Sequence, residues 1–161
     1  MKAPPESALA SKAASKAKKA RRAPAKSLAE GPESGFRRFS TPNGFSVLIG
    51  RNNRQNDLLS LKVAKGDDLW FHARGVPGAH VVLKAQSGRD PEHEDVLCAA
   101  NLAAWFSKAK NDSKVNVTQT TGAHVSKPKG APPGLVSVSK ETVVVAKPHR
   151  SMAVQSQDLR K

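Results

Sequence analysis

The chain has 161 residues and a formal net charge of +14, from 27 Lys and Arg against 13 Asp and Glu. The length suits one modest core with some unstructured sequence, and the charge favours a polyanionic partner, either nucleic acid or an anionic membrane surface. The single cysteine, Cys98, excludes an intrachain disulfide and fits a reducing compartment. No apolar run approaches the roughly 20 residues that a membrane-spanning helix needs. Of the two polyanions, we expect nucleic acid as the partner and no membrane, because nucleic acid is the commoner partner of basic chains.

The first 35 residues are rich in Ala, Lys, Ser and Pro and contain no aromatic residue. Such a segment cannot bury enough apolar surface to offset the entropy cost of ordering, so we expect a disordered basic tail over residues 1–35. It is either a plain solvated tail or an organellar presequence, since no acidic residue lies between Ser7 and Ala29. The tail has eight basic against three acidic residues, whereas residues 36–150 have seventeen against nine. The predicted folded part is therefore basic in its own right.

A hairpin and a helix are predicted to follow the tail. Strands are expected over residues 36–40 and 45–49, joined by a turn that contains Asn43-Gly44, a strong hairpin signal. A helix is expected over residues 54–64, with Asn52 or Asn53 as its cap and Lys65-Gly66 at its end. We expect Asp57 in this helix to pair with a nearby arginine.

Residues 69–73 are predicted to form a half-buried strand, because apolar residues alternate there with others. The residues predicted to face the core are Leu69, Phe71 and Ala73. The residues that share the opposite face are Trp70, His72 and Arg74. That face either contacts a partner or packs inside the fold, with Trp70 beneath the helix predicted over residues 90–110. The segment Val76-Pro77-Gly78-Ala79 is a candidate type II turn before a strand over residues 80–85.

The strongest helix pattern lies between residues 90 and 110, with Asp90 as the predicted cap and Pro91 in the first helical position. A strand over residues 115–121 and a loop over 124–134 should follow, then strands over 135–138 and 142–146 joined by a tight turn. Order is expected to end near Pro148, which leaves residues 149–161 as a flexible C-terminus. The chain is therefore predicted to be α+β, with a mainly antiparallel sheet and two helices packed on it, in one domain of residues 36–148.

Three blocks of sequence resemble one known family. They are GRNNRQNDLL at residues 50–59, DLWFHAR at 68–74 followed by VPGAHVV at 76–82, and KPKG at 127–130 followed by Pro133-Gly134. In this order and spacing, the blocks are similar to the NFACT-R domain family over about residues 36–148. The resemblance implies a non-catalytic RNA-binding module, related to the C-terminal part of ribosome quality-control factors that act on large ribosomal subunits carrying tRNA.

The resemblance implies tRNA or ribosomal RNA as partner, in a translation or ribosome quality-control context, with the large ribosomal subunit as a further partner. Two alternatives remain: a DNA- or chromatin-binding protein driven by the basic tail, and a ribosome-associated adaptor for proteins. The sequence shows no N-terminal NFACT domain, helix-hairpin-helix segment or long coiled coil, so we expect binding without tRNA-directed tailing activity. Ala79 stands where the family usually has serine. An intracellular location is expected, in the cytoplasm or the chloroplast.

The candidates for nucleic-acid contact within these blocks are Arg51, Asn52, Arg54, Trp70, His72, Arg74, His80, Lys127 and Lys129. Basic side chains pair with phosphate, short amides hold phosphate oxygens, and aromatic rings stack on bases. For each block the alternative is structural, either a hydrogen-bond network or a solvated loop. We expect no catalytic site, metal or cofactor, because the histidines lack metal-ligand spacing and no nucleophile or phosphate-loop motif is present.

Overall fold

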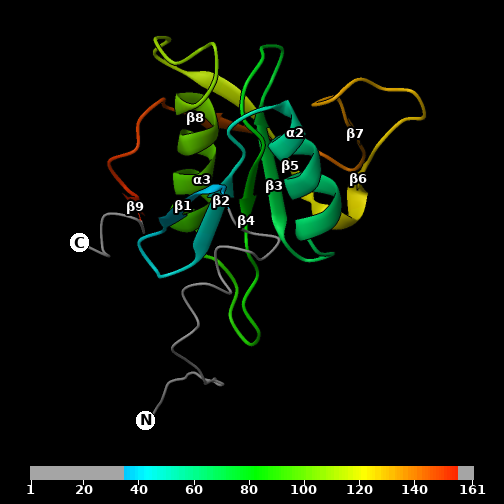
Figure 1. The fold of residues 1–161 in the computed structure, drawn as a ribbon. Coiled ribbons are helices and arrows are strands. Elements are labelled where there is room, and N and C mark those ends of the chain that lie inside the picture. The colour runs from blue at the N-terminus through cyan, green and yellow to red at the C-terminus, as the bar shows by residue number, and fades with distance from the viewer. Residues whose placement is uncertain (1–34, 156–161) are drawn as a thin grey trace. The chain divides into compact units, whose positions relative to one another are not determined.

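The computed structural model describes residues 35–155, so the expected tail lies outside the described residues apart from Gly35. The fold is α+β, as predicted, with a seven-stranded antiparallel sheet in the order β8-β5-β3-β4-β2-β1-β9 (Figure 1). Its strands are β1 (Arg37–Ser40), β2 (Ser46–Ile49), β3 (Leu69–Ala73), β4 (Val81–Leu83), β5 (Val115–Thr121), β8 (Thr142–Ala146) and β9 (Val154–Gln155). No helix in the described range is long and apolar enough to cross a membrane.

Sequence patterns predicted several strands correctly. The expected ranges 69–73, 115–121 and 142–146 coincide with β3, β5 and β8. The predicted first hairpin is also confirmed, since β1 pairs with β2 in a register that sets Phe39 opposite Val47. At its turn Gly44 has a φ of 85°, which glycine adopts without steric cost, and the Gly44 N–H donates to the Thr41 carbonyl at 3.0 Å.

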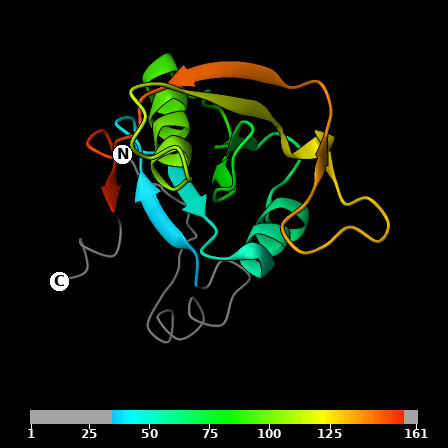
Figure 2. The same ribbon diagram turned by 90° about the horizontal axis from the view of Figure 1, so that it is seen from above.

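Helices cover both faces of the sheet (Figure 2). The long helix α3 (His93–Trp105) packs on the face that carries Phe71, Val47 and Val81. The short helix α2 (Asn53–Leu58) continues as a π-helical turn, η1 (Leu59–Val63), and contributes Leu59 and Val63 to a second core against the opposite face. The residues of that second core that come from the sheet are Leu48, Trp70 and Val82.

The two cores correct the expectation for the strand at residues 69–73. Phe71 and Ala73 are fully buried in the first core, as predicted. Trp70 is only 3% exposed, but the helical segment beside it is η1 rather than the helix of residues 90–110. The strand is therefore buried on both faces, and alternation alone suggested one open face because His72 and Arg74 are polar.

Two local predictions of helix and turn chemistry were wrong. Asp90 does not cap α3: Glu92 is the cap, and the helix ends at Trp105 rather than near Lys110. In the predicted type II turn, the glycine with positive φ is Gly75, at 76°, and not Gly78. Gly78 instead lets the chain approach the segment that follows α3, because a Cβ there would lie 2.7 Å from the Cβ of Ser107.

The C-terminal part also departs from the predictions. Strand β7 (Ser137–Val138) lies within the expected range 135–138, but it pairs with β6 (Val125–Ser126) in a separate two-stranded sheet. The chain was expected to be flexible from residue 149, yet β9 returns to pair with β1, setting Gln155 opposite Phe39. Backbone pairing across a distance in the chain has no local signature, which is why the sequence did not indicate it.

The start of α3 depends on the fully buried carboxylate of Asp95. Its Oδ2 accepts from the Glu92 N–H at 2.8 Å, which completes a capping box, and its Oδ1 accepts from the Asn43 N–H at 3.0 Å. Burial alone would raise the pKa of Asp95, but hydrogen bonds from Thr41, Glu92 and Asn43 outweigh it and hold the pKa below its usual value. The carboxylate thereby ties α3 to the turn of the first hairpin.

Replacing Asp95 by alanine should therefore destabilise the fold by about 2–4 kcal/mol, because it removes the capping box and leaves buried N–H groups without acceptors. Urea unfolding followed by circular dichroism measures the change. Asp90→Ala is the matched control, since Asp90 is exposed and is not the cap, and its cost should stay within roughly 0.5 kcal/mol. Equal losses for the two variants would contradict the assignment of the cap.

Candidate nucleic-acid interface

A groove of about 440 Å³ lies beside the start of α2, where the segment after β2 faces the turn before β4 and the end of α3. The residues that line it are Arg37, Gly50, Arg51, Asn52, Asn53, Asn56, Pro77, Gly78, Ala79, Trp105, Phe106, Ser107 and Lys108. Three of them are cationic and none is acidic. The groove therefore brings together the first two family-like blocks, which are separated in sequence, in a setting that suits an anion.

Backbone contacts around Gly50 hold the two walls together. The Gly50 N–H donates to the His80 carbonyl at 3.1 Å, and the Asn56 Oδ1 accepts from the His80 N–H at 3.1 Å. A side chain at residue 50 would collide with the Asn56 amide, so glycine is required by close approach. These contacts fix Arg51, the next residue in the chain, beside the turn that precedes β4.

The beginning of α2 confirms the predicted cap. The Asn52 Oδ1 accepts from the Gln55 N–H at 2.9 Å, and the Gln55 Oε1 accepts from the Arg51 N–H at 2.8 Å. Arg51, Asn52 and Asn53 are exposed. The same residues therefore order the strand–helix junction through backbone and cap contacts and present their polar side chains to the groove.

Repulsion between like charges marks this part of the surface. The pKa of Arg37 is lowered by burial and by the positive charges of Arg51 and Arg150. A cluster of guanidinium groups gathers counterions, and an anionic ligand that replaces them relieves the repulsion. The electrostatics of the groove therefore favour a polyanion such as a nucleic-acid backbone.

Two aromatic rings at the end of α3 complete the groove. The guanidinium carbon of Arg37 lies 4.9 Å from the centroid of Phe106, and the Lys110 ammonium lies 4.1 Å from the centroid of Trp105. Both rings are half-buried. A half-buried tryptophan offers a ring on which a base can stack, and the cations around it can pair with phosphates. Proteins that bind single-stranded nucleic acid combine these two kinds of contact.

The sequence did not point to five of the groove residues, namely Arg37, Trp105, Phe106, Ser107 and Lys108. They lie outside the family-like blocks, in a strand and at the end of a helix. The only available signal was the combination of Trp105 and Lys108 at the end of the predicted helix, which also fits an ordinary basic last turn.

Trp70 and His80 belong to a buried polar network beneath the groove. The Trp70 Nε1–H donates to the Ser60 Oγ at 2.7 Å, and the same hydroxyl lies 2.7 Å from the His80 Nδ1. The His72 ring stacks on Trp70, with centroids 6.1 Å apart, and meets His80 edge to face at 5.3 Å. Trp70 and His80 are each only 3% exposed, so their rings support the fold rather than offer a surface to a base.

Both histidines of the network favour the neutral form. The pKa of His80 falls to about 4 through burial and the charge of His72, although Asp57 and the backbone of Asn56 and Gly134 act in the opposite direction. Burial also lowers the pKa of His72, against a hydrogen bond with the backbone of Gly78. At neutral pH, therefore, neither ring supplies a positive charge for phosphate.

The loop of residues 127–135 is fastened to α2 by an ion pair. The Lys127 ammonium lies 3.0 Å from the Asp57 Oδ2 and also donates to the carbonyls of Pro132 and Leu135, at 2.6 and 2.9 Å. The Asp57 Oδ1 accepts from the Gly134 N–H at 3.1 Å. Asp57 therefore pairs with a lysine rather than the expected arginine, and Lys127 uses its three donors inside the protein.

The nine candidate residues thus divide into three groups. Arg51 and Asn52 line the groove. Four others make contacts within the protein, in the buried network or in the loop of residues 127–135, and they are Trp70, His72, His80 and Lys127. The remaining candidates are exposed but lie outside the lining of the groove, and they are Arg54, Arg74 and Lys129.

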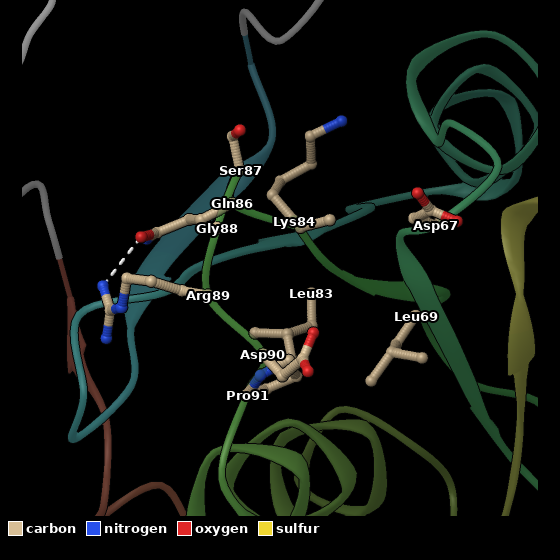
Figure 3. A pocket seen from close by; sticks show the side chains of 11 residues that line it. Asp67, Leu69, Leu83, Lys84, Gln86, Ser87, Gly88, Arg89, Asp90 and Pro91 are labelled. Carbon is tan, nitrogen blue, oxygen red and sulfur yellow. Dashed lines mark hydrogen bonds between the residues drawn. The ribbon is translucent and has the colours of Figure 1, made fainter.

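A second cavity, of about 690 Å³, lies between the end of β4 and the start of α3 (Figure 3). Its lining includes Asp67 and Asp90, and its two cations are already engaged. Lys84 lies 2.6 Å from the Asp68 Oδ2, and Arg89 donates to the Gln86 Oε1 at 2.7 Å and to the Asn43 carbonyl at 2.6 Å. Mixed charge makes this cavity a poorer site for a polyanion than the groove.

Within residues 35–155, no group of three or more His, Cys, Asp and Glu is arranged to hold a metal ion. His124 bonds to the Thr121 hydroxyl at 2.9 Å. Asp68 accepts from the Lys65 and Ala85 N–H groups, at 2.8 and 2.7 Å. It therefore closes the connection between η1 and β3.

Comparison with known proteins gives a consistent result. The family model described as NFACT protein RNA binding domain matches residues 35–140. The Rqc2 homolog RqcH of Bacillus subtilis (strain 168) is 38% identical over 117 residues, which cover 73% of this chain and 20% of that protein. The homolog of the same name in Streptococcus suis (strain 05ZYH33) is 43% identical over 101 residues, covering 63% of this chain and 18% of that protein. The chain thus spans about a fifth of the length of these relatives.

A solved structure supports the fold. The C-terminal part of the fibronectin/fibrinogen-binding protein from Streptococcus suis superposes with a TM-score of 0.68 and 37% sequence identity. The match covers 73% of this chain and 47% of the solved one.

The depressed pKa of His80 makes stability depend on pH in a defined window. An unfolded histidine takes up a proton near pH 6.5, whereas the folded His80 stays neutral until about pH 4. The stability due to neutral burial is therefore complete above pH 6.5 and is lost as the pH falls towards 4, by up to about 3 kcal/mol.

Urea unfolding at a series of pH values from about 7.5 to about 4.5 measures this loss, because the series starts above the pKa of an unfolded histidine and ends close to that of the folded His80. His80→Gln should be less stable at neutral pH and should show a shallower decline, since its side chain does not titrate. Carboxylates and His72 titrate in both proteins, so the difference between the two curves is the observable. Parallel curves would show that His80 does not titrate as described.

Proposed function

Because the chain belongs to the NFACT protein RNA binding domain family, we propose that it binds structured RNA through the cationic groove, as a non-catalytic module. The observation that carries this proposal is the lining itself, where Arg37, Arg51 and Lys108 converge beside Trp105 without any carboxylate. Phosphate contacts of this kind supply affinity and depend on salt, but they carry no base sequence information. The expected ligand is therefore recognised by shape and charge.

We propose tRNA or ribosomal RNA as the natural ligand. The curated relatives are named as homologs of Rqc2, and the family resemblance implies action on large ribosomal subunits. The groove offers a stacking ring beside cations, which suits RNA segments whose bases are accessible better than a regular duplex. Binding would take place on the ribosome or a released subunit, in the cytoplasm or in the chloroplast.

Affinity measured by fluorescence anisotropy for a tRNA, a single-stranded RNA and a duplex DNA, each at several salt concentrations, tests the proposal. The tRNA should bind tighter than the duplex DNA at every salt concentration. Equal affinity for all three ligands would leave only general polyanion binding. Loss of all binding on deletion of residues 1–34 would show that the groove is not the site and would favour the alternative of binding driven by the tail.

Neutralising two groove cations should weaken RNA binding and reduce its salt dependence. The variant carries Arg51→Gln and Lys108→Gln, and its slope of log affinity against log salt should become less steep by roughly 1.5, because two phosphate contacts are lost. The control carries Lys62→Gln and Lys65→Gln, which remove the same charge from exposed positions outside the groove. Equal effects in the two variants would show that net charge alone matters.

Fluorescence of the two tryptophans should report occupation of the groove. Trp70 is 3% exposed, whereas Trp105 is half-buried in the lining, so a bound base should quench mainly Trp105. The wild type should lose emission on titration with RNA, and Trp105→Phe should lose most of that response while it still binds in the anisotropy assay. An unchanged response in Trp105→Phe would place the bound RNA elsewhere.

A further inference from the structure

The strand β8 forms one edge of the sheet. In the described part of the chain it has a neighbouring strand, β5, on one side only. Val143 and Val145 are 49% and 56% exposed, among the most exposed large apolar residues of the described chain. Natural proteins usually protect such an edge with charge, proline or a bulge, because it offers unpaired backbone groups to another strand.

Hydrogen-bond alternation fixes which backbone groups of β8 face outward. The Arg74 N–H donates to the Asn116 carbonyl at 2.8 Å, so Asn116 and every second residue along β5 direct their peptide groups to β3. Val117, between them, directs its groups to its partner Val144 in β8. The N–H and C=O groups of Val143 and Val145 therefore point away from the sheet.

The side chains of alternate residues along this edge form a self-complementary row. Glu141, Val143, Val145 and Lys147 fall on one face by period two, and all four are exposed. A second copy of the strand, antiparallel and centred on Val144, would set Val143 opposite Val145 and Glu141 opposite Lys147. The outward groups of Val143 and Val145 would then form the closely paired hydrogen bonds of an antiparallel ladder.

We infer that β8 pairs with β8 of a second copy of this chain, in the antiparallel register centred on Val144, to make one continuous sheet across a homodimer. The occupant is identified by two coincident properties of the strand, its outward backbone groups and its opposite charges at symmetric positions. The Lys147 N–H is already bonded to the Asn101 Oδ1 at 2.9 Å, so the new ladder consists of the two valines with an ion pair at each end. The dimer goes beyond RNA binding and doubles the number of grooves in one assembly.

Charge reversal at the two ends is a direct test of this register. Glu141 and Lys147 lie just outside the two ends of β8, six residues apart, which is roughly 20 Å of extended chain, so they do not meet within a single chain. Glu141→Lys or Lys147→Glu alone would place like charges opposite each other at both ends of the pairing. The two changes together restore opposite charges in the dimer and leave the net charge of the chain unaltered.

Sedimentation velocity of the full chain without RNA, over a range of concentrations at physiological ionic strength, measures the association. At this salt the Debye length is about 8 Å, so general repulsion between the basic chains is screened. The wild type should approach twice the mass of one chain. Each single reversal should weaken dimerisation about tenfold, and the double reversal should restore it.

Val145→Lys, at an exposed position, should give a monomer with the circular dichroism spectrum of the wild type. A wild type that stays monomeric at all concentrations overturns the inference, as does a dimer that survives Val145→Lys. Failure of the double reversal to restore association, with both single variants folded, overturns the register. RNA affinity, measured separately on the Val145→Lys monomer, distinguishes loss of the dimer from failure of the groove.

Discussion

The Ser60 hydroxyl, held between an indole and an imidazole, is the contact on which the rest of the site depends. The Trp70 Nε1 can only donate, so the Ser60 oxygen accepts from it and the hydroxyl proton is free to donate to the His80 Nδ1. That donation requires a neutral His80 with its proton on Nε2, in agreement with a pKa of about 4. One hydroxyl thereby joins η1, β3 and the start of β4 in a region where an unpaired polar group costs about 1–3 kcal/mol.

The groove follows from the backbone of the same histidine. The His80 carbonyl accepts from Gly50 and its N–H donates to Asn56, so the segment after β2 and the turn before β4 are fixed against each other. The backbone of Arg51 is consequently held next to the turn, while its side chain is exposed. The neutral imidazole of His80 therefore belongs to the buried network, whereas Arg51 lies in the lining of the groove that we propose as the RNA site.

Local sequence patterns predicted most of the strands and helices but only some of the residues that line the groove. Alternation located β3 and β5, because period two is a property of the strand itself. It could not tell that η1 covers Trp70, since burial of a second face depends on a segment elsewhere in the chain. Asp90 fits the sequence pattern of a cap, but Glu92 is the cap because the Asp95 carboxylate completes a capping box with it and also reaches the turn at Asn43. Arg37 and Trp105 join the groove only through tertiary packing.

Lys127 and Lys129 show why a family-like motif does not by itself identify contact residues. Both lie in the same Lys-Pro-Lys segment, but Lys127 pairs with Asp57 and donates to two backbone carbonyls, while Lys129 is exposed. Asp68 forms an ion pair with Lys84 in the same way. In each of the two ion pairs described between residues 35 and 155, a lysine is neutralised by an aspartate, and none of these four residues lines the groove. The groove, in contrast, has three cations and no carboxylate in its lining, and that distribution, rather than the motif, is the reason for proposing the interface there.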